Sequence, residues 1–134
     1  MSNINFQILE KIPKYNLLKN KIKNKKIIVR VNMNVQSMNG LIADPIRLDN
    51  TKEIIKFLLS EGATPILIAH NGRLIRSSGI DKRQSLATSA NYIQNKLFPD
   101  EKIIFHNDSL AKDSREEGLR ISKDQIIDNA VNII

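Results

Sequence analysis

The chain has 134 residues, of which 41% are hydrophobic, which is enough for one domain with a buried core. No apolar run approaches the roughly 18 residues that a transmembrane helix needs, and the start shows no basic segment followed by a long apolar one, as a secretory signal would. There is no Cys, which excludes disulfides and thiolate metal sites. The two histidines, His70 and His106, lack the spacing of metal ligands. We therefore expect a cytoplasmic protein with no metal site.

The net charge of +7 comes from the N-terminal segment. Residues 1–30 hold eight Lys or Arg side chains and one acidic side chain, Glu10, whereas residues 31–134 hold thirteen of each sign. A basic arm can bind nucleic acid or an acidic surface. However, no aromatic side chain lies among the lysines between Lys19 and Lys26 to stack on bases. We treat residues 1–25 as a basic lead-in and do not expect nucleic acid or a membrane as a partner.

Strands and helices alternate in the predicted element order. Residues 1–24 are expected to form an irregular or partly helical lead-in. Short β-branched or apolar runs predict strands at 26–31, 66–69, 102–105 and 125–128. Apolar residues at helical spacing predict helices at 49–60, with Asp49, Asn50 or Thr51 as the N-cap, and at 85–97, with Leu86, Ala90, Ile93 and Leu97 on the buried face. A polar helix, with Asp108 or Ser109 as its cap, is expected at 109–118. A strand, a helix and a second strand at this spacing form a βαβ unit, so we expect a parallel sheet.

Local signals refine these boundaries. The runs at 26–31 and 66–69 do not alternate with polar residues, which predicts that both strands are buried. Turns are expected at 39–40, which is Asn-Gly, and at 44–45, which is Asp-Pro. Gly62 is a natural stop for the first helix. The connection from 32 to about 47 is long for an α/β protein, and long ordered connections are often functional.

Polar side chains follow the first two predicted strands. Asn32 and Asn34 come after the first strand, Arg47 lies on the long connection, and His70 and Arg73 follow the second strand. The carboxyl ends of parallel strands meet at one edge of a sheet, so these side chains can converge on one ligand. Arginine pairs with phosphate or carboxylate in bidentate geometry. The sequence has no GxxxxGK[ST] or GxGxxG loop, so it predicts a site for a small anion and no nucleotide site.

Three short motifs, in this order, resemble the N-terminal domain of the phosphoglycerate kinase family. Residues 30–35 read RVNMNV, 44–48 read DPIRL and 69–73 read AHNGR, where the family has RVDFNVP, a DxxRI-type motif and SHLGRP. The dipeptide at 85–86 and the segment at 126–129 resemble the family's SL and LLEN. The order and spacing agree over about residues 26–131. The resemblance implies a three-layer α/β/α fold with a parallel sheet, as an incomplete N-terminal domain of the phosphoglycerate kinase fold.

The resemblance also implies a function. The family transfers a phosphoryl group between 1,3-bisphosphoglycerate with ADP and 3-phosphoglycerate with ATP in glycolysis, and this domain binds 3-phosphoglycerate. Arg47 corresponds to the family's catalytic arginine, which would stabilise the phosphoryl group in flight. The substrate contacts implied by the motifs are Asn32, Met33, Asn34, Arg47, His70, Asn71, Gly72 and Arg73.

Several positions depart from the family pattern. Asn32 replaces an Asp, so a charged hydrogen-bond acceptor is lost; Asn71 replaces a Leu, Leu74 a Pro, and Val131 a phosphate-binding Arg. The first strand is central in the family sheet, and here we expect it at an open edge.

The chain reads as a single partial domain over 1–134, without the family's C-terminal domain, which carries MgATP or MgADP. We therefore expect no cofactor on this chain and no activity from it alone, unless a separate nucleotide-domain chain is a partner. The alternative is a non-catalytic module that binds a phosphorylated metabolite or a partner.

Overall fold

The computed structural model describes residues 14–72, 85–107 and 121–134. Within them, a four-stranded parallel sheet has the strand order β1-β4-β6-β5. Its strands are β1 (Lys26–Arg30), β4 (Thr64–Ile68), β5 (Ile103–Phe105) and β6 (Val131–Ile133). A small antiparallel hairpin consists of β2 (Ser37–Met38) and β3 (Leu41–Ile42). The helices are α2 (Ile46–Asp49), α3 (Lys52–Ser60) and α4 (Ala87–Tyr92), a π-helical turn (Ile93–Leu97), and 3-10 turns at Tyr15–Leu18 and Lys123–Gln125.

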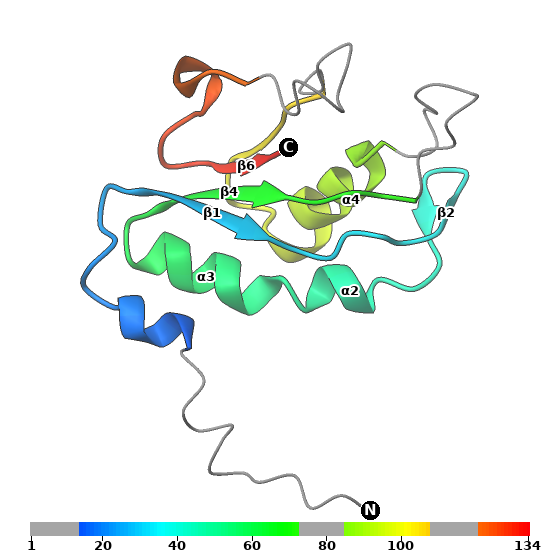
Figure 1. The fold of residues 1–134 in the computed structure, drawn as a ribbon. Helices are drawn as coiled ribbons and strands as arrows, with labels where there is room; N and C mark the ends of the chain where they lie inside the picture. The colour runs from blue at the N-terminus through cyan, green and yellow to red at the C-terminus, as the bar shows by residue number, and fades with distance from the viewer. Residues whose placement is uncertain (1–13, 73–84, 108–120) are drawn as a thin grey trace, which may run out of the picture.

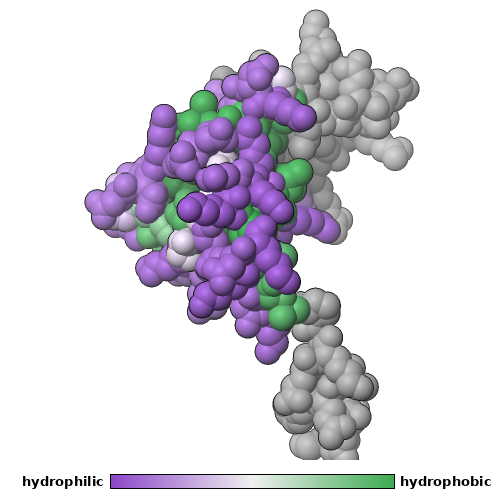
Figure 2. Space-filling model, turned by 90° about the vertical axis from the view of Figure 1, so that its left-hand side faces the viewer, coloured by the Kyte–Doolittle hydropathy of each residue, from purple (hydrophilic) through white to green (hydrophobic). Residues whose placement is uncertain are grey.

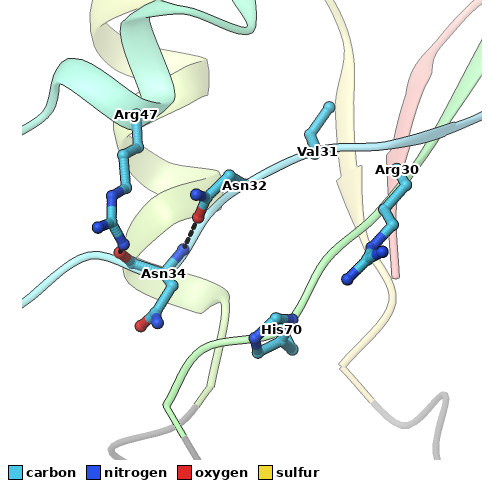
Figure 3. A pocket seen from close by; sticks show the side chains of 6 residues that line it. All are labelled: Arg30, Val31, Asn32, Asn34, Arg47 and His70. Atoms are coloured by element: carbon cyan, nitrogen blue, oxygen red, sulfur yellow. Dashed lines mark hydrogen bonds between the residues drawn. The ribbon is translucent and has the colours of Figure 1, made fainter.

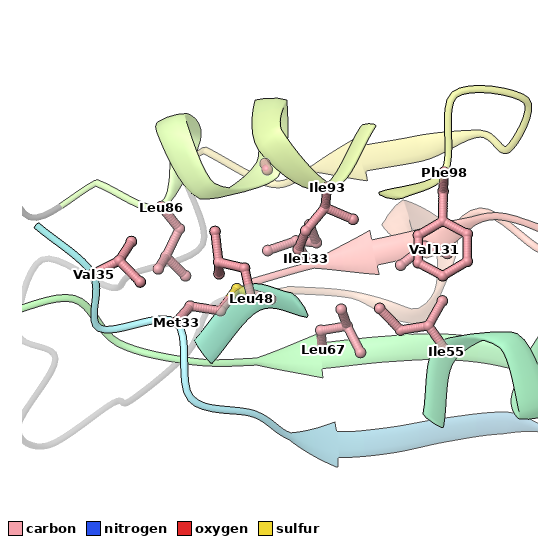
Figure 4. Close-up of a cluster of buried hydrophobic side chains, with 11 residues drawn as sticks. Met33, Val35, Leu48, Ile55, Leu67, Leu86, Ile93, Phe98, Val131 and Ile133 are labelled. Carbon is pink, nitrogen blue, oxygen red and sulfur yellow. The ribbon is translucent and has the colours of Figure 1, made fainter. Parts of the chain in front are cut away.

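The α/β class and the parallel sheet confirm the sequence prediction. Chain connections from β1 to β4 and from β4 to β5 move in the same direction across the sheet. Right-handed crossovers therefore place α2, α3 and α4 on the same face, and these helices share one apolar core with the sheet (Figures 1 and 4). The buried members of that core are Met33, Val35, Leu48, Ile55, Leu67, Leu86, Ala90, Ile93, Phe98, Val131 and Ile133. The helix predicted at 109–118 lies outside the described residues.

The two strands predicted to be buried differ. β4 is buried along nearly its whole length, as predicted, because β1 and β6 pair with it on either side. The prediction that β1 is buried is wrong, since its side chains alternate between exposed and half-buried. Ile27 and Val29 pack toward α3, whereas Ile28 is 66% exposed. Within the described part of the chain β1 is an edge strand that pairs with β4 alone, as expected for the first strand.

The single helix predicted at 49–60 is two helices. α2 ends at Asp49 and α3 begins at Lys52. Between them Thr51 is buried, and its hydroxyl donates a hydrogen bond to the carbonyl of Leu48 at 2.6 Å. A Thr hydroxyl that bonds the preceding turn competes with regular helical pairing, which explains the break. No Asp49, Asn50 or Thr51 side chain caps α3, contrary to the prediction.

The predicted turns are present. Asn39 and Gly40 both have positive φ angles, of 53° and 76°, and connect β2 to β3, as expected of an Asn-Gly hairpin. Asp44 precedes α2, and its carboxylate accepts a hydrogen bond from the Ile46 N–H at 3.1 Å. Gly62 has a φ of 71° and follows the end of α3, which is the conformation that glycine adopts most readily after a helix.

The last part of the chain corrects one prediction and confirms two. The strand predicted at 125–128 is absent, because Ser122 and Gln125 form a capping box that starts a 3-10 turn there. The strand is instead β6, which lies between β4 and β5 and is fully buried. The predicted strand at 102–105 is β5. The helix predicted at 85–97 is α4 with the π-helical turn, and it buries Leu86 and Ile93 as expected.

Candidate functional site

A pocket of about 300 Å³ lies at the carboxyl ends of β1 and β4 (Figure 3). Three segments of the chain supply its walls: the end of β1 with the loop that follows, helix α2, and the residues after β4. These are the places at which an open α/β sheet binds ligands. Its lining residues are Arg30, Val31, Asn32, Asn34, Arg47 and His70.

The loop after β1 is held in shape by its own amide groups. The Val31 N–H pairs with the carbonyl of Ile68 at 3.0 Å, so the pairing between the two strands continues up to a residue that lines the pocket. Immediately beyond, the Asn34 N–H donates to the side-chain oxygen of Asn32 at 3.2 Å, which is the Asx-turn that favours Asn in tight loops. Met33, between them, is fully buried in the core. Its side chain therefore anchors the loop while its neighbours face the pocket.

Arg47 reaches the pocket from helix α2. Its Nη1 donates to the main-chain carbonyl of Asn34 at 2.6 Å, and Leu48, next along the helix, is fully buried. The buried leucine fixes the helix, and the carbonyl fixes one side of the guanidinium. Because a guanidinium carries five N–H donors in a fork, the others can face an anion in the pocket.

The segment after β4 contributes His70 and is tied to the opposite wall. The Gly72 N–H donates to the side-chain oxygen of Asn34 at 3.2 Å, and Gly72 has a φ of 71°. His70 is exposed at the pocket wall, and Asn71 is half-buried. Arg73 lies outside the described residues. Of the expected site residues, the structure thus brings Asn32, Asn34, Arg47 and His70 together around one pocket.

Arg30 is a pocket residue that the sequence reasoning missed. It is the last residue of β1 and lies within the run that the sequence predicts to be a buried strand, although it is exposed and lines the pocket. A charged residue at the end of an otherwise apolar run was the available signal. With Arg30 included, two guanidiniums lie on the described wall of the pocket, and no acidic side chain lines it.

The described part of the basic lead-in, residues 14–25, lies at the other end of the sheet. β1 runs from Lys26 at its amino end to Arg30 at the pocket, so Lys14 to Lys26 are remote from the site. That end presents a mainly hydrophilic surface (Figure 2). One of its cations, Lys26, pairs with Asp128 at 3.4 Å. The positive charge on the described pocket wall therefore comes from Arg30 and Arg47, and not from the lysines at the other end of the sheet.

The described residues contain neither a metal-ligand cluster nor a membrane-spanning helix. Nowhere in residues 14–72, 85–107 and 121–134 do three His, Asp or Glu side chains group as metal ligands would. Across the same ranges, every helix is too short or too polar to span a membrane.

Comparisons with known proteins indicate the same family as the three sequence motifs. The sequence profile of the family described as "Phosphoglycerate kinase" matches residues 17–128. This chain belongs to the phosphoglycerate kinase family. Curated phosphoglycerate kinases similar to it include those of Plasmodium falciparum, 37% identical over 98 residues, and Xanthobacter flavus, 29% identical over 104 residues. These alignments cover 72% and 78% of this chain but 22% and 25% of the relatives.

The fold agrees with the family too. The phosphoglycerate kinase structures from Coxiella burnetii and Pyrococcus horikoshii OT3 both superpose with a TM-score of 0.57, at 20% and 19% sequence identity. Each superposition covers 84% of this chain and 25% of the other. The chain thus spans about a quarter of the length of its phosphoglycerate kinase relatives, and it corresponds to part of their N-terminal domain.

Proposed function

We propose that the pocket binds 3-phosphoglycerate, and that these 134 residues form the acceptor-substrate side of a phosphoglycerate kinase. The observation that carries the proposal is the convergence of Arg30, Arg47 and His70 on one pocket, with no acidic side chain among the described residues that line it. A ligand with a phosphate at one end and a carboxylate at the other offers an acceptor group to each guanidinium. Such charge-assisted bonds are roughly twice as strong as neutral ones.

Arg47 has the role closest to the chemistry in this proposal. Phosphoryl transfer involves little covalent work by the protein and mostly requires that developing charge be neutralised at fixed positions. Arg47 is held on one side by the Asn34 carbonyl, so its remaining donors need little reorganisation to meet the transferring group. The nucleotide that supplies the phosphoryl group in the family is not assigned to any described residue. We therefore expect the 134-residue chain to bind substrate without turning it over.

The test is calorimetric titration of the chain with 3-phosphoglycerate at low salt. We expect binding that weakens by about tenfold or more in Arg47→Ala and in Arg30→Ala, because each removes a charge-assisted hydrogen bond. Lys56→Ala is the matched control, since Lys56 is an exposed cation on α3 that does not line the pocket. It should bind as the unmodified chain does. Equal losses in all three variants, or no binding by the unmodified chain, would contradict the proposal.

A second assay separates catalysis from binding. Incubation of the chain with 3-phosphoglycerate and MgATP should yield no 1,3-bisphosphoglycerate, whereas robust turnover would contradict the expected inactivity. The alternative function, a non-catalytic module for a phosphorylated metabolite, is favoured by Asn32, an amide at the position where the family motif has an Asp. It predicts the same binding, still without turnover after a nucleotide-domain chain is added in trans.

A further inference from the structure

The chain contains two Asn-Gly pairs, Asn39-Gly40 and Asn71-Gly72. In such a pair the main-chain nitrogen of the glycine can attack the side-chain carbonyl of the asparagine, because glycine has no side chain to hinder the approach. The first pair forms the turn between β2 and β3. The second pair lies at the pocket, where the family motif has Leu in place of Asn71, so this chain places a reactive amide there.

Asn71 lies between two residues that belong to the pocket wall or contact it. His70 lines the pocket, and the Gly72 N–H donates to Oδ1 of Asn34, another lining residue, at 3.2 Å. Asn71 is half-buried and both of its neighbours are exposed, so water reaches this turn. Consecutive Cα atoms are about 3.8 Å apart, and the Debye length at physiological salt is about 8 Å. A charge formed at Asn71 would therefore act on an anion at the pocket wall.

The reaction needs water and no other co-reactant. The Gly72 nitrogen loses its proton and attacks Cγ of Asn71, which forms a new C–N bond. The bond from Cγ to the side-chain nitrogen breaks, and ammonia leaves behind a cyclic succinimide. Water then opens the ring at either carbonyl and gives aspartate or isoaspartate. In total one water is consumed, one ammonia is released, and a neutral amide becomes a carboxylate that is ionised at neutral pH.

We propose that Asn71-Gly72 is a deamidation site and that its conversion lowers the affinity of the pocket for anions. The effect on affinity rests on the proposed function, whereas the reaction itself does not. Arg30 and Arg47 provide the positive charge of the described lining, which has no acidic side chain. A carboxylate at residue 71 repels an anionic ligand and competes with it for these guanidiniums. Isoaspartate also lengthens the main chain by one carbon, which displaces the Gly72 N–H from Asn34.

The contact between Gly72 and Asn34 controls the rate of this reaction. The Gly72 nitrogen must give up its proton and turn toward the Asn71 side chain, and it is held back while its N–H donates to Asn34. We therefore expect Asn34→Ala to speed conversion at Asn71 by about threefold, as the loss of one such hydrogen bond implies. The turn at Asn39 has no recorded contact with the Asn34 side chain and serves as the reference in the same sample.

The experiment follows conversion and binding together while the purified chain ages at mildly alkaline pH. Peptide mass spectrometry reports the conversion of amide to acid at each Asn-Gly pair, and calorimetry reports the affinity for 3-phosphoglycerate. We expect the affinity to fall by about fivefold as Asn71 is converted, because a nearby like charge repels the ligand.

Two variants serve as controls, each compared with its own fresh sample. Asn71→Gln keeps an amide but cyclises far more slowly, because its side chain is longer by one methylene, so its affinity should not change with age. Asn39→Asp carries the acid at the other Asn-Gly pair, outside the pocket lining, and should still lose affinity as Asn71 reacts.

The outcomes are distinct. If Asn39 is converted while Asn71 stays intact, even in Asn34→Ala, the deamidation site is refuted. If Asn71 is converted and the affinity stays constant, or if Asn71→Gln loses affinity equally on ageing, the effect on the pocket is refuted. If the fresh chain does not bind 3-phosphoglycerate, the proposed function fails and the effect on affinity fails with it. The mass of the peptide that contains Asn71 still decides the reaction in that case.

Discussion

The His106 ring and the Asn132 side chain are joined by a hydrogen bond of 3.0 Å between Nε2 and Oδ1. Asn132 is fully buried in β6, and its Oδ1 also accepts the Ile127 N–H, while Nδ2 donates to the carbonyls of Ile127 and Ala130. Since the orientation of the amide is fixed by these main-chain contacts, His106 must carry its hydrogen on Nε2. One buried amide thus fastens the loop before β6 to the end of β5.

Replacing Asn132 by Leu should destabilise the protein strongly. The change keeps the number and branching of the side-chain heavy atoms but leaves the part-buried main-chain groups of Ile127 and the buried carbonyl of Ala130 without their side-chain partner, which we expect to cost about 3 kcal/mol. Urea unfolding followed by circular dichroism measures this as a lower midpoint. Ile133→Val, at a neighbouring buried position, is the control and should cost about 1 kcal/mol. A leucine variant as stable as that control would refute the importance of the hydrogen bonds.

Gly62 should tolerate Asn better than Ala. Its φ of 71° is a left-handed conformation, so Ala is strained there and should cost about 1 kcal/mol. The space itself is sufficient, because an added Cβ would lie 3.4 Å from the nearest atom, Lys23 Cγ. Asn adopts this conformation more readily, as Asn24 and Asn129 already do here. Thermal melting of the two variants side by side checks the order, and an equal loss in both would point to a steric cause.

Tyr92 should titrate above its ordinary range because of Asp49. Its hydroxyl donates to the Asp49 carboxylate at 2.8 Å, and this hydrogen bond, with smaller effects of burial and of the charge, raises the pKa of Tyr92. The folded pKa exceeds the unfolded value of about 10. The contact therefore stabilises the fold fully below pH 10, as estimated from that value, and the contribution is lost as the pH rises through the folded pKa.

Phenolate absorbance measures this titration. In a Tyr15→Phe background Tyr92 is the only tyrosine left, since the chain has two. Adding Asp49→Asn should lower the pKa of Tyr92, because the negative acceptor that favours the neutral phenol is removed. An unchanged titration curve would show that the contact with Asp49 does not form in solution.

Arg47→Lys should weaken 3-phosphoglycerate binding even though the charge is kept. The guanidinium contacts the Asn34 carbonyl with one N–H and has further donors in a fixed fork, whereas an ammonium is a compact point charge. We expect a loss of roughly threefold, which is smaller than the loss expected in Arg47→Ala. Calorimetry reports it, with Lys56→Arg as a control for the reverse exchange outside the pocket. Full affinity in Arg47→Lys would mean that the charge alone is sufficient.

The strands β4 and β5 could be predicted from the sequence because they consist of uninterrupted apolar residues, whereas β6 could not. β4 and β5 were predicted because Ile and Leu, or Ile and Phe, follow one another directly. β6 was missed because Asn132 stands at its centre, and a buried amide with four hydrogen bonds looks like a surface residue in sequence. Residues 125–128 were mistaken for a strand because two isoleucines outweighed the capping signal of Ser122 and Gln125.

The polar residues after each strand were predictable, and the network among them was not. Asn32, Asn34, Arg47 and His70 follow from the rule that parallel strands end at one edge. The bond from Gly72 to Asn34 joins positions 38 residues apart, and no local pattern encodes such a contact. Arg30 is different, because its position as a charged residue at the end of an otherwise apolar run is a local signal that the prediction of a buried strand did not use.

A change at Asn34 would affect two walls of the pocket at once. Its carbonyl restrains the arginine on α2 and its side chain restrains the turn after β4, so both walls are fastened to a single residue. Shortening that one side chain would release the turn at Gly72, and a shift of its backbone would loosen the arginine as well. Affinity for an anion and local rigidity are therefore expected to decline together, because both walls of the pocket depend on Asn34.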